Sequence, residues 1–69
     1  MKLSARNQLK GTVIAIEKGT VNSTVRIDVG NGAVITSMIT NAAVADLGLT
    51  EGATAYAVVK ASDVMVAVD

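Results

Sequence analysis

Hydrophobic and polar positions alternate most regularly between Val21 and Val29. One set of alternate positions is mainly apolar: Val21, Ser23, Val25, Ile27 and Val29. The other set is polar: Asn22, Thr24, Arg26 and Asp28. Because successive side chains of a strand point to opposite faces, this pattern predicts a half-buried strand. The β-branched and small residues from Leu9 to Ile16 predict a preceding strand, joined to it as a hairpin by the turn Glu17–Thr20.

A second hairpin is predicted by the turn Gly30–Gly32, which contains the Asn-Gly dipeptide. The strand expected to follow it, Ala33–Thr40, is apolar on both faces. One face carries Ala33, Ile35 and Ile39, and the other carries Val34 and Met38. We therefore expect this strand to be buried on two sides, one facing a barrel interior and the other a subunit contact.

A short helix is predicted over residues 40–48. Thr40 or Asn41 can cap its first N–H groups, and Gly48 suits the left-handed position after the last turn.

Two further strands are predicted after the turn Thr50–Gly52. They are Ala53–Lys60 and Val64–Val68, separated by a bend at Ala61–Asp63. The predicted fold class is therefore all-β. The order of elements indicates an OB-like five-stranded Greek-key barrel with one short helix between strands 3 and 4. A small β-sandwich is the alternative.

The length of the chain, 69 residues, corresponds to a single domain spanning 1–69. A chain of this size buries only about 60% of its unfolded surface, so a lone monomer is marginally stable. With 51% hydrophobic residues and no cysteine, it has the composition of a small domain that is stabilised by subunit contacts rather than disulfides. We therefore expect a homo-oligomer.

Charge and aromatic content argue against several partners. Six basic and six acidic residues cancel without forming a run, and Tyr56 is the only aromatic residue, so nucleic-acid binding is not expected. No apolar stretch reaches the roughly 20 residues that span a bilayer, so no membrane partner is expected. The start of the chain lacks the apolar core of a signal peptide, so we expect a cytoplasmic protein.

The residues available for chemistry favour binding over catalysis. Histidine and cysteine are both absent, and the six carboxylates show no spacing that would make two of them converge. We therefore expect no enzymatic activity, no catalytic residues and no direct ligands for a metal cation.

Two basic-plus-hydroxyl pairs are candidates for binding a small oxyanion. In an extended segment Ser4 and Arg6 point the same way, and Lys60 and Ser62 repeat this spacing near the other end of the chain. A guanidinium flanked by hydroxyl and amide donors suits such an anion. The alternative is that these are solvated charges and turn residues near strand ends.

The segment Ser4–Gly11, with the sequence SARNQLKG, closely resembles the opening of Mop domains, the molybdate-binding modules of molbindins. Residues 35–40, 47–52 and 57–65 also fit the Mop pattern in register. The resemblance thus covers nearly the whole chain and identifies 1–69 as a single Mop domain.

This resemblance implies reversible binding, storage and homeostasis of molybdate or tungstate in the cytoplasm, with no organic cofactor. The oxyanions would lie between subunits of a homohexamer arranged as a trimer of dimers. The residues that match oxyanion-binding positions are Ser4, Ala5, Arg6, Lys60, Ala61 and Ser62, with Thr40 from a neighbouring subunit. Asn7 and Gln8 are expected to be structural support, and Ala43 stands where some related domains have serine.

A second oxyanion site near a threefold axis is also implied by the family. Groups around residues 18–22 are candidates for it, because a turn offers free N–H groups. Two other functions remain open: a nucleic-acid-binding OB module and a purely structural oligomer.

Overall fold

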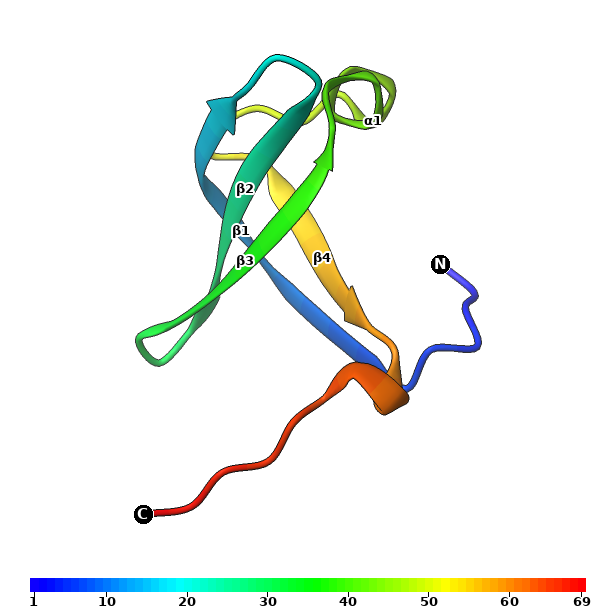
Figure 1. Ribbon diagram of the computed structural model, residues 1–69, viewed down its shortest axis with the longest axis vertical. Helices are drawn as coiled ribbons and strands as arrows, with labels where there is room; N and C mark the ends of the chain where they lie inside the picture. Colours follow the sequence, from blue (N-terminus) through cyan, green and yellow to red (C-terminus); the bar gives the residue numbers. More distant parts are fainter.

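The computed structural model describes residues 1–69 and contains one four-stranded antiparallel sheet in the order β3-β2-β1-β4 (Figure 1). The strands are β1 (Asn7–Lys18), β2 (Asn22–Gly30), β3 (Ala33–Thr40) and β4 (Thr54–Val59). Helix α1 (Asn41–Leu47) lies between β3 and β4, and a 3₁₀ turn (Ala61–Asp63) follows β4. The predicted all-β class and the short helix between strands 3 and 4 are confirmed.

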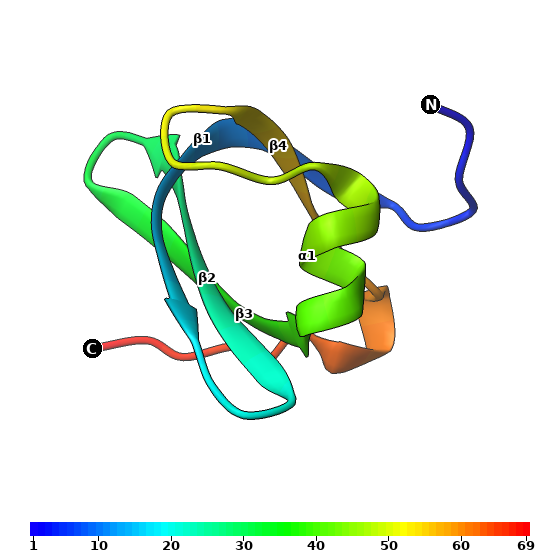
Figure 2. The ribbon, with the colours of Figure 1, turned by 90° about the horizontal axis from the view of Figure 1, so that it is seen from above.

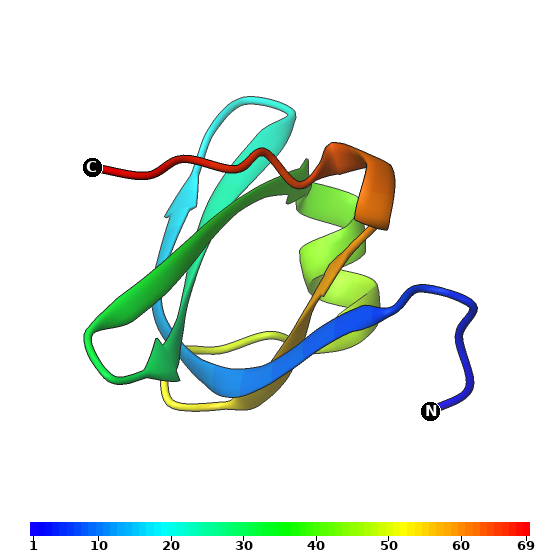
Figure 3. The same ribbon diagram turned by 90° about the horizontal axis from the view of Figure 1, so that it is seen from below.

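The sheet curls so that its two edge strands, β3 and β4, face each other across an opening, with α1 beside it (Figures 2 and 3). The core lies inside the curl. It consists of Val13, Val25, Ile27 and Ala57, with half-buried apolar residues packed around them. Val44 on α1 and Leu49 just after α1 belong to this surrounding layer, so the helix contributes directly to the core.

Strand β2 buries the face that its alternation predicted. Ser23, Val25 and Ile27 are buried, whereas Asn22 and Asp28 on the other face are exposed. In β3 the inner residues Ile35 and Ile39 are half-buried, but on the other face Val34 is 44% exposed and Met38 72% exposed. The expected burial of β3 on two sides is therefore not found within one chain.

A β-bulge in β1 decides which of its residues face the core. Val13 pairs with Ile27 and Ala15 with Arg26, so Ile14 is an extra residue in the ladder. The shift turns both Val13 and Ile16 toward the core although they are three residues apart, and Ile14 is left 46% exposed. The alternation of a regular strand cannot produce that spacing.

The predicted fifth strand, Val64–Val68, is not formed, and the predicted five-stranded barrel is wrong on this point. After the 3₁₀ turn the chain leaves the sheet as an extended tail with no strand pairing (Figure 1). Met65, Val66 and Val68 are each about nine-tenths exposed. Their sequence suits a strand, but a strand requires a neighbour that supplies hydrogen bonds, and no segment of this chain does so.

Candidate functional site

Segments from the two ends of the chain leave the same end of the β1–β4 ladder. Asn7, the first residue of β1, pairs with Val59, the last residue of β4. Arg6 and Lys60 are therefore the residues that come directly before and directly after this last pair along the chain. The structure thus places the two predicted basic-plus-hydroxyl pairs at one end of the molecule, although they are more than 50 residues apart in sequence.

The basic and hydroxyl side chains of the two predicted pairs are exposed and make no hydrogen bond or ion pair within the chain. Ser4, Arg6, Lys60 and Ser62 are all exposed. The single salt bridge of the molecule joins Arg26 to Glu17, on β2 and β1, so neither Arg6 nor Lys60 is neutralised by a carboxylate. Two positive charges without a carboxylate partner, on segments that also carry two hydroxyls, are the kinds of group that bind a small anion, so this end of the sheet is the candidate site.

The backbone at this end offers further donors. The N–H of Asp63 donates to the carbonyl of Lys60 (2.9 Å) and closes the 3₁₀ turn. The N–H groups of Ala61 and Ser62 lie at the start of this turn, where a helix leaves its first donors without a partner inside it. Ala61 is exposed and Ala5 half-buried.

Two carboxamides hold the segments in place. Gln8 Nε2 donates to the carbonyl of Ala5 (3.0 Å), and Asn7 Nδ2 donates to the carbonyl of Val59 (3.2 Å). A polar hollow on this surface is lined by five residues: Leu3, Ser4, Ala5, Arg6 and Gln8. The hollow contains the N-terminal half of the predicted site, and Lys60, Ala61 and Ser62 are not part of its lining.

Thr40 lies at the other end of the sheet. It pairs with Asn22, beyond the far end of β1, and caps α1 by accepting the N–H of Ala43 on its hydroxyl oxygen (3.0 Å). Of the two predicted caps, Thr40 and Asn41, Thr40 is the one that caps the helix, and Gly48 has the predicted left-handed conformation. One chain therefore does not bring Thr40 to the Arg6 and Lys60 side chains.

The turn proposed for a second oxyanion site, residues 18–22, is tied to α1. Gly19 N–H donates to the carbonyl of Asn22 (2.8 Å), and Asn41 holds the turn by two bonds. Its Nδ2 donates to the carbonyl of Gly19 (3.0 Å), and its N–H donates to the carbonyl of Val21 (2.8 Å). A small cavity of about 270 Å³ lies between the turn and the helix, with Lys18, Ser23 and Asn41 in its lining.

Ser23 and Asn41 form a polar pair that the sequence reading missed. The buried hydroxyl of Ser23 donates to Asn41 Oδ1. A signal for it was present, because Ser23 is the only polar residue on the apolar face of β2 and a buried hydroxyl requires a partner.

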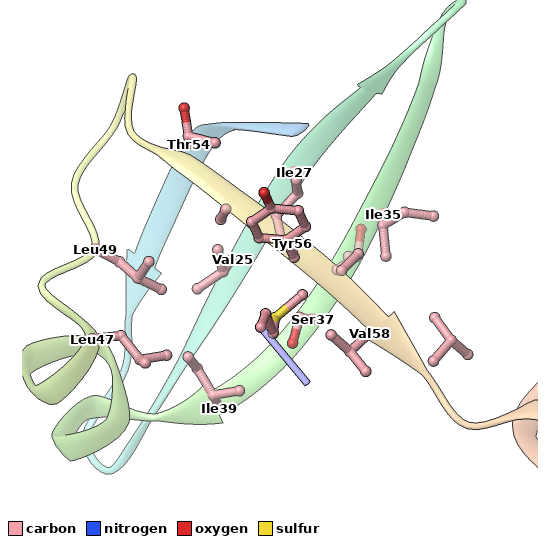
Figure 4. Close-up of a pocket in the computed structure, with 15 residues that line it drawn as sticks. Val25, Ile27, Ile35, Ser37, Ile39, Leu47, Leu49, Thr54, Tyr56 and Val58 are labelled. Atoms are coloured by element: carbon pink, nitrogen blue, oxygen red, sulfur yellow. The ribbon is translucent and has the colours of Figure 1, made fainter. Parts of the chain in front are cut away.

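The structure also has an apolar groove of about 550 Å³ that was not predicted from the sequence (Figure 4). It lies between the edge strands, with Ile35, Ser37 and Ile39 on β3, and Tyr56 and Val58 on β4. Twelve of its fifteen lining residues are hydrophobic, so it has none of the character of an anion site. Nowhere in the structure do three carboxylate, His or Cys side chains lie close enough together to hold a metal ion. Its helices are too short or too polar to be candidates for crossing a membrane.

Comparisons with known proteins identify the family. The TOBE domain matches residues 3–66, so the chain belongs to the TOBE domain family. It is 55% identical, over all 69 residues of both chains, to a Haemophilus influenzae protein named "Probable molybdenum-pterin-binding protein". Within the family the chain is a Mop protein, one of the molbindins, which confirms the resemblance read from the sequence.

Two solved structures agree with this assignment. MopII from Clostridium pasteurianum superimposes with a TM-score of 0.90 at 46% identity, covering 97% of this chain and 100% of MopII. ModG, described as a cytoplasmic molybdate-binding protein and solved with molybdate bound, gives a TM-score of 0.89 at 55% identity. That match covers 94% of this chain and 46% of the ModG chain. The Haemophilus influenzae relative is thus named for binding molybdenum-pterin, and ModG for binding molybdate.

Proposed function

We propose that this chain is a single Mop domain, residues 1–69, which binds molybdate reversibly at subunit interfaces of a homo-oligomer. The observation that carries the proposal is the pairing of Asn7 with Val59, which leaves the unpaired charges of Arg6 and Lys60 at one end of the sheet. Membership of the Mop group supports molybdate as the anion. Tungstate, a tetrahedral dianion of nearly the same size, would bind the same groups.

The site performs its function by replacing the hydration shell of the anion. A dianion that leaves water loses a large solvation energy, and charged donors offset that loss best. Arg6 and Lys60 supply positive charge, Ser4 and Ser62 supply hydroxyl donors, and the backbone around Ala5 and Ala61 supplies N–H groups. Since no covalent step is involved, the anion is released by mass action when its free concentration falls. This behaviour suits storage and homeostasis in the cytoplasm.

Assembly completes the site in this proposal. Thr40 is exposed at the far end of the sheet, so its hydroxyl can join Arg6 and Lys60 only from a neighbouring subunit. The cap bond uses an oxygen lone pair and leaves the O–H of Thr40 free to donate to an anion. The apolar groove and the exposed tail 64–69 both support subunit contacts, because soluble monomers rarely expose large apolar patches. A hexamer built as a trimer of dimers is the assembly we propose.

Calorimetric titration tests the proposal and separates it from its rivals. The protein is titrated with molybdate, tungstate, sulfate and phosphate, and with a single-stranded DNA oligonucleotide. We expect molybdate and tungstate to bind. A purely structural oligomer would release no heat with any anion, and a nucleic-acid-binding module would bind the oligonucleotide instead.

The variant Arg6→Ala should bind molybdate at least about tenfold more weakly, since a charged hydrogen bond to the anion is lost. Arg26→Ala is the matched control, because Arg26 is also a partly exposed guanidinium but is already paired with Glu17. Equal affinity of Arg6→Ala and the wild type would refute the role of Arg6.

A further inference from the structure

Asn7 lies between the two halves of the proposed oxyanion site. Its backbone follows Arg6 directly, and its side chain reaches across the ladder to the carbonyl of Val59, the residue before Lys60. We propose that Asn7 is a positioning residue that couples the segment Ser4–Arg6 to the segment Lys60–Ser62. This inference rests on the proposed function and names the residue that aligns its two halves.

The geometry of the peptide bond explains how one hydrogen bond can align Lys60. The carbonyl of Val59 and the N–H of Lys60 belong to the same planar peptide unit. When Asn7 Nδ2 holds that carbonyl (3.2 Å), it fixes the plane from which the backbone of Lys60 continues. The direction in which the chain enters the 3₁₀ turn Ala61–Asp63 is therefore set from the Arg6 side of the ladder.

The position of this bond at the end of the ladder makes it more than a general structural contact. Asn7 and Val59 form the last pair, and beyond them no strand pairing joins the two segments. Terminal pairs open readily, so without the carboxamide the two cationic segments would move independently. Binding would then have to order them first, and a site that is not preorganised binds more weakly.

Asn7 acts through its neighbours rather than on the anion. It is half-buried and does not line the polar hollow that contains Ser4 and Arg6. Gln8 provides a contrast, because its bond to the carbonyl of Ala5 (3.0 Å) closes a loop within the N-terminal segment alone. Gln8 therefore organises one half of the site, whereas Asn7 joins both halves.

A double-mutant cycle with molybdate calorimetry distinguishes these roles. Asn7→Ala should lower molybdate affinity by about threefold to tenfold, the range of one side-chain hydrogen bond. Because Lys60 is then no longer held toward Arg6, the affinity lost on Lys60→Ala should be at least about threefold smaller in the Asn7→Ala background than in the wild type. In the Gln8→Ala background the Lys60→Ala penalty should stay at its wild-type size.

Several outcomes would overturn the inference. If the Lys60→Ala penalty is the same with and without Asn7, the two halves are not coupled through this side chain. Asn7→Gln, which keeps the donor on a longer arm, should recover part of the lost coupling, and no recovery would count against the hydrogen bond. If Asn7→Ala does not fold, Asn7→Thr serves in its place, since threonine suits a strand but has no carboxamide to reach Val59.

Failure of this inference can be told apart from failure of the proposed function. If the wild type binds no molybdate, the proposed function is wrong. If the wild type binds and the Asn7 variant binds equally well, only the positioning role is wrong.

Discussion

At the scale of single residues, Gly11 shows how the lack of a side chain shapes the sheet. A Cβ at this position would collide with the carbonyl oxygen of Asp28 and lie 2.7 Å from Ile27 Cγ2. Gly11 therefore allows β1 and β2 to approach closely just before the bulge at Ile14.

Gly11→Ala should destabilise the protein by about 1–3 kcal/mol, because overpacking against backbone cannot be relieved by a side-chain movement. Urea unfolding at one fixed protein concentration measures this loss. Thr12→Ala, on the exposed neighbouring position of the same strand, should change stability by no more than about 0.5 kcal/mol. A Gly11→Ala variant as stable as the wild type would contradict the close approach of the strands.

At the scale of elements, α1 joins the end of β3 to the β1–β2 turn. Thr40 caps its first turn, and Asn41 binds the turn at Gly19 and Val21. Seven residues are too few for a helix that is stable alone, so these bonds and the packing of Val44 against the core maintain it. Thr40 thus has a structural role that is independent of any anion.

Thr40→Val should lower stability by about 1 kcal/mol, because it removes the cap hydroxyl while it preserves the shape of the side chain. Under the proposed function it should also weaken molybdate binding, and Thr40→Ser should restore both properties. Thermal unfolding with and without molybdate measures the two effects separately. Thr50→Val is a matched control, since the hydroxyl of Thr50 makes no hydrogen bond within the chain. Normal stability of Thr40→Val would show that the cap bond contributes nothing.

At the scale of the whole molecule, a single chain buries little of its apolar surface. Only five of its 69 residues are buried, and the groove between β3 and β4 and the tail both expose apolar side chains. Burial of apolar surface is the main favourable term in folding, so the proposed subunit contacts would supply burial that a single chain lacks. Ligand bound between subunits would stabilise the assembly further, by about 2.7 kcal/mol per site at a ligand concentration 100 times the dissociation constant.

Deletion of residues 64–69 should reduce the mass of the assembly and lower its melting temperature, because the exposed valines and methionine of the tail would no longer be available for subunit contacts. Light scattering coupled to size-exclusion chromatography gives the mass. Deletion of Asp69 alone serves as the control, since it removes no apolar side chain. If the shortened protein has the same number of subunits as the full chain, the tail is not part of the interfaces.

The sequence alone was sufficient for the local features of this protein. Alternation located β2, the Asn-Gly dipeptide located the β2–β3 turn, and Thr40 and Gly48 marked the two ends of α1. Each of these sequence patterns lies within a few residues of the strand, turn or helix end that it predicts. The polar types and spacing of Ser4, Arg6, Lys60 and Ser62 predict the candidate site, and the resemblance to Mop domains predicts molybdate as its ligand.

Only the tertiary structure decided how these parts meet. The pairing of Asn7 with Val59 brings two distant segments together, the bulge at Ile14 resets the faces of β1, and the tail 64–69 remains without a strand partner. Strand register depends on hydrogen bonds between segments that are far apart in the chain. No local pattern encodes which backbone will lie alongside, and for the tail that neighbour is not present within a single chain.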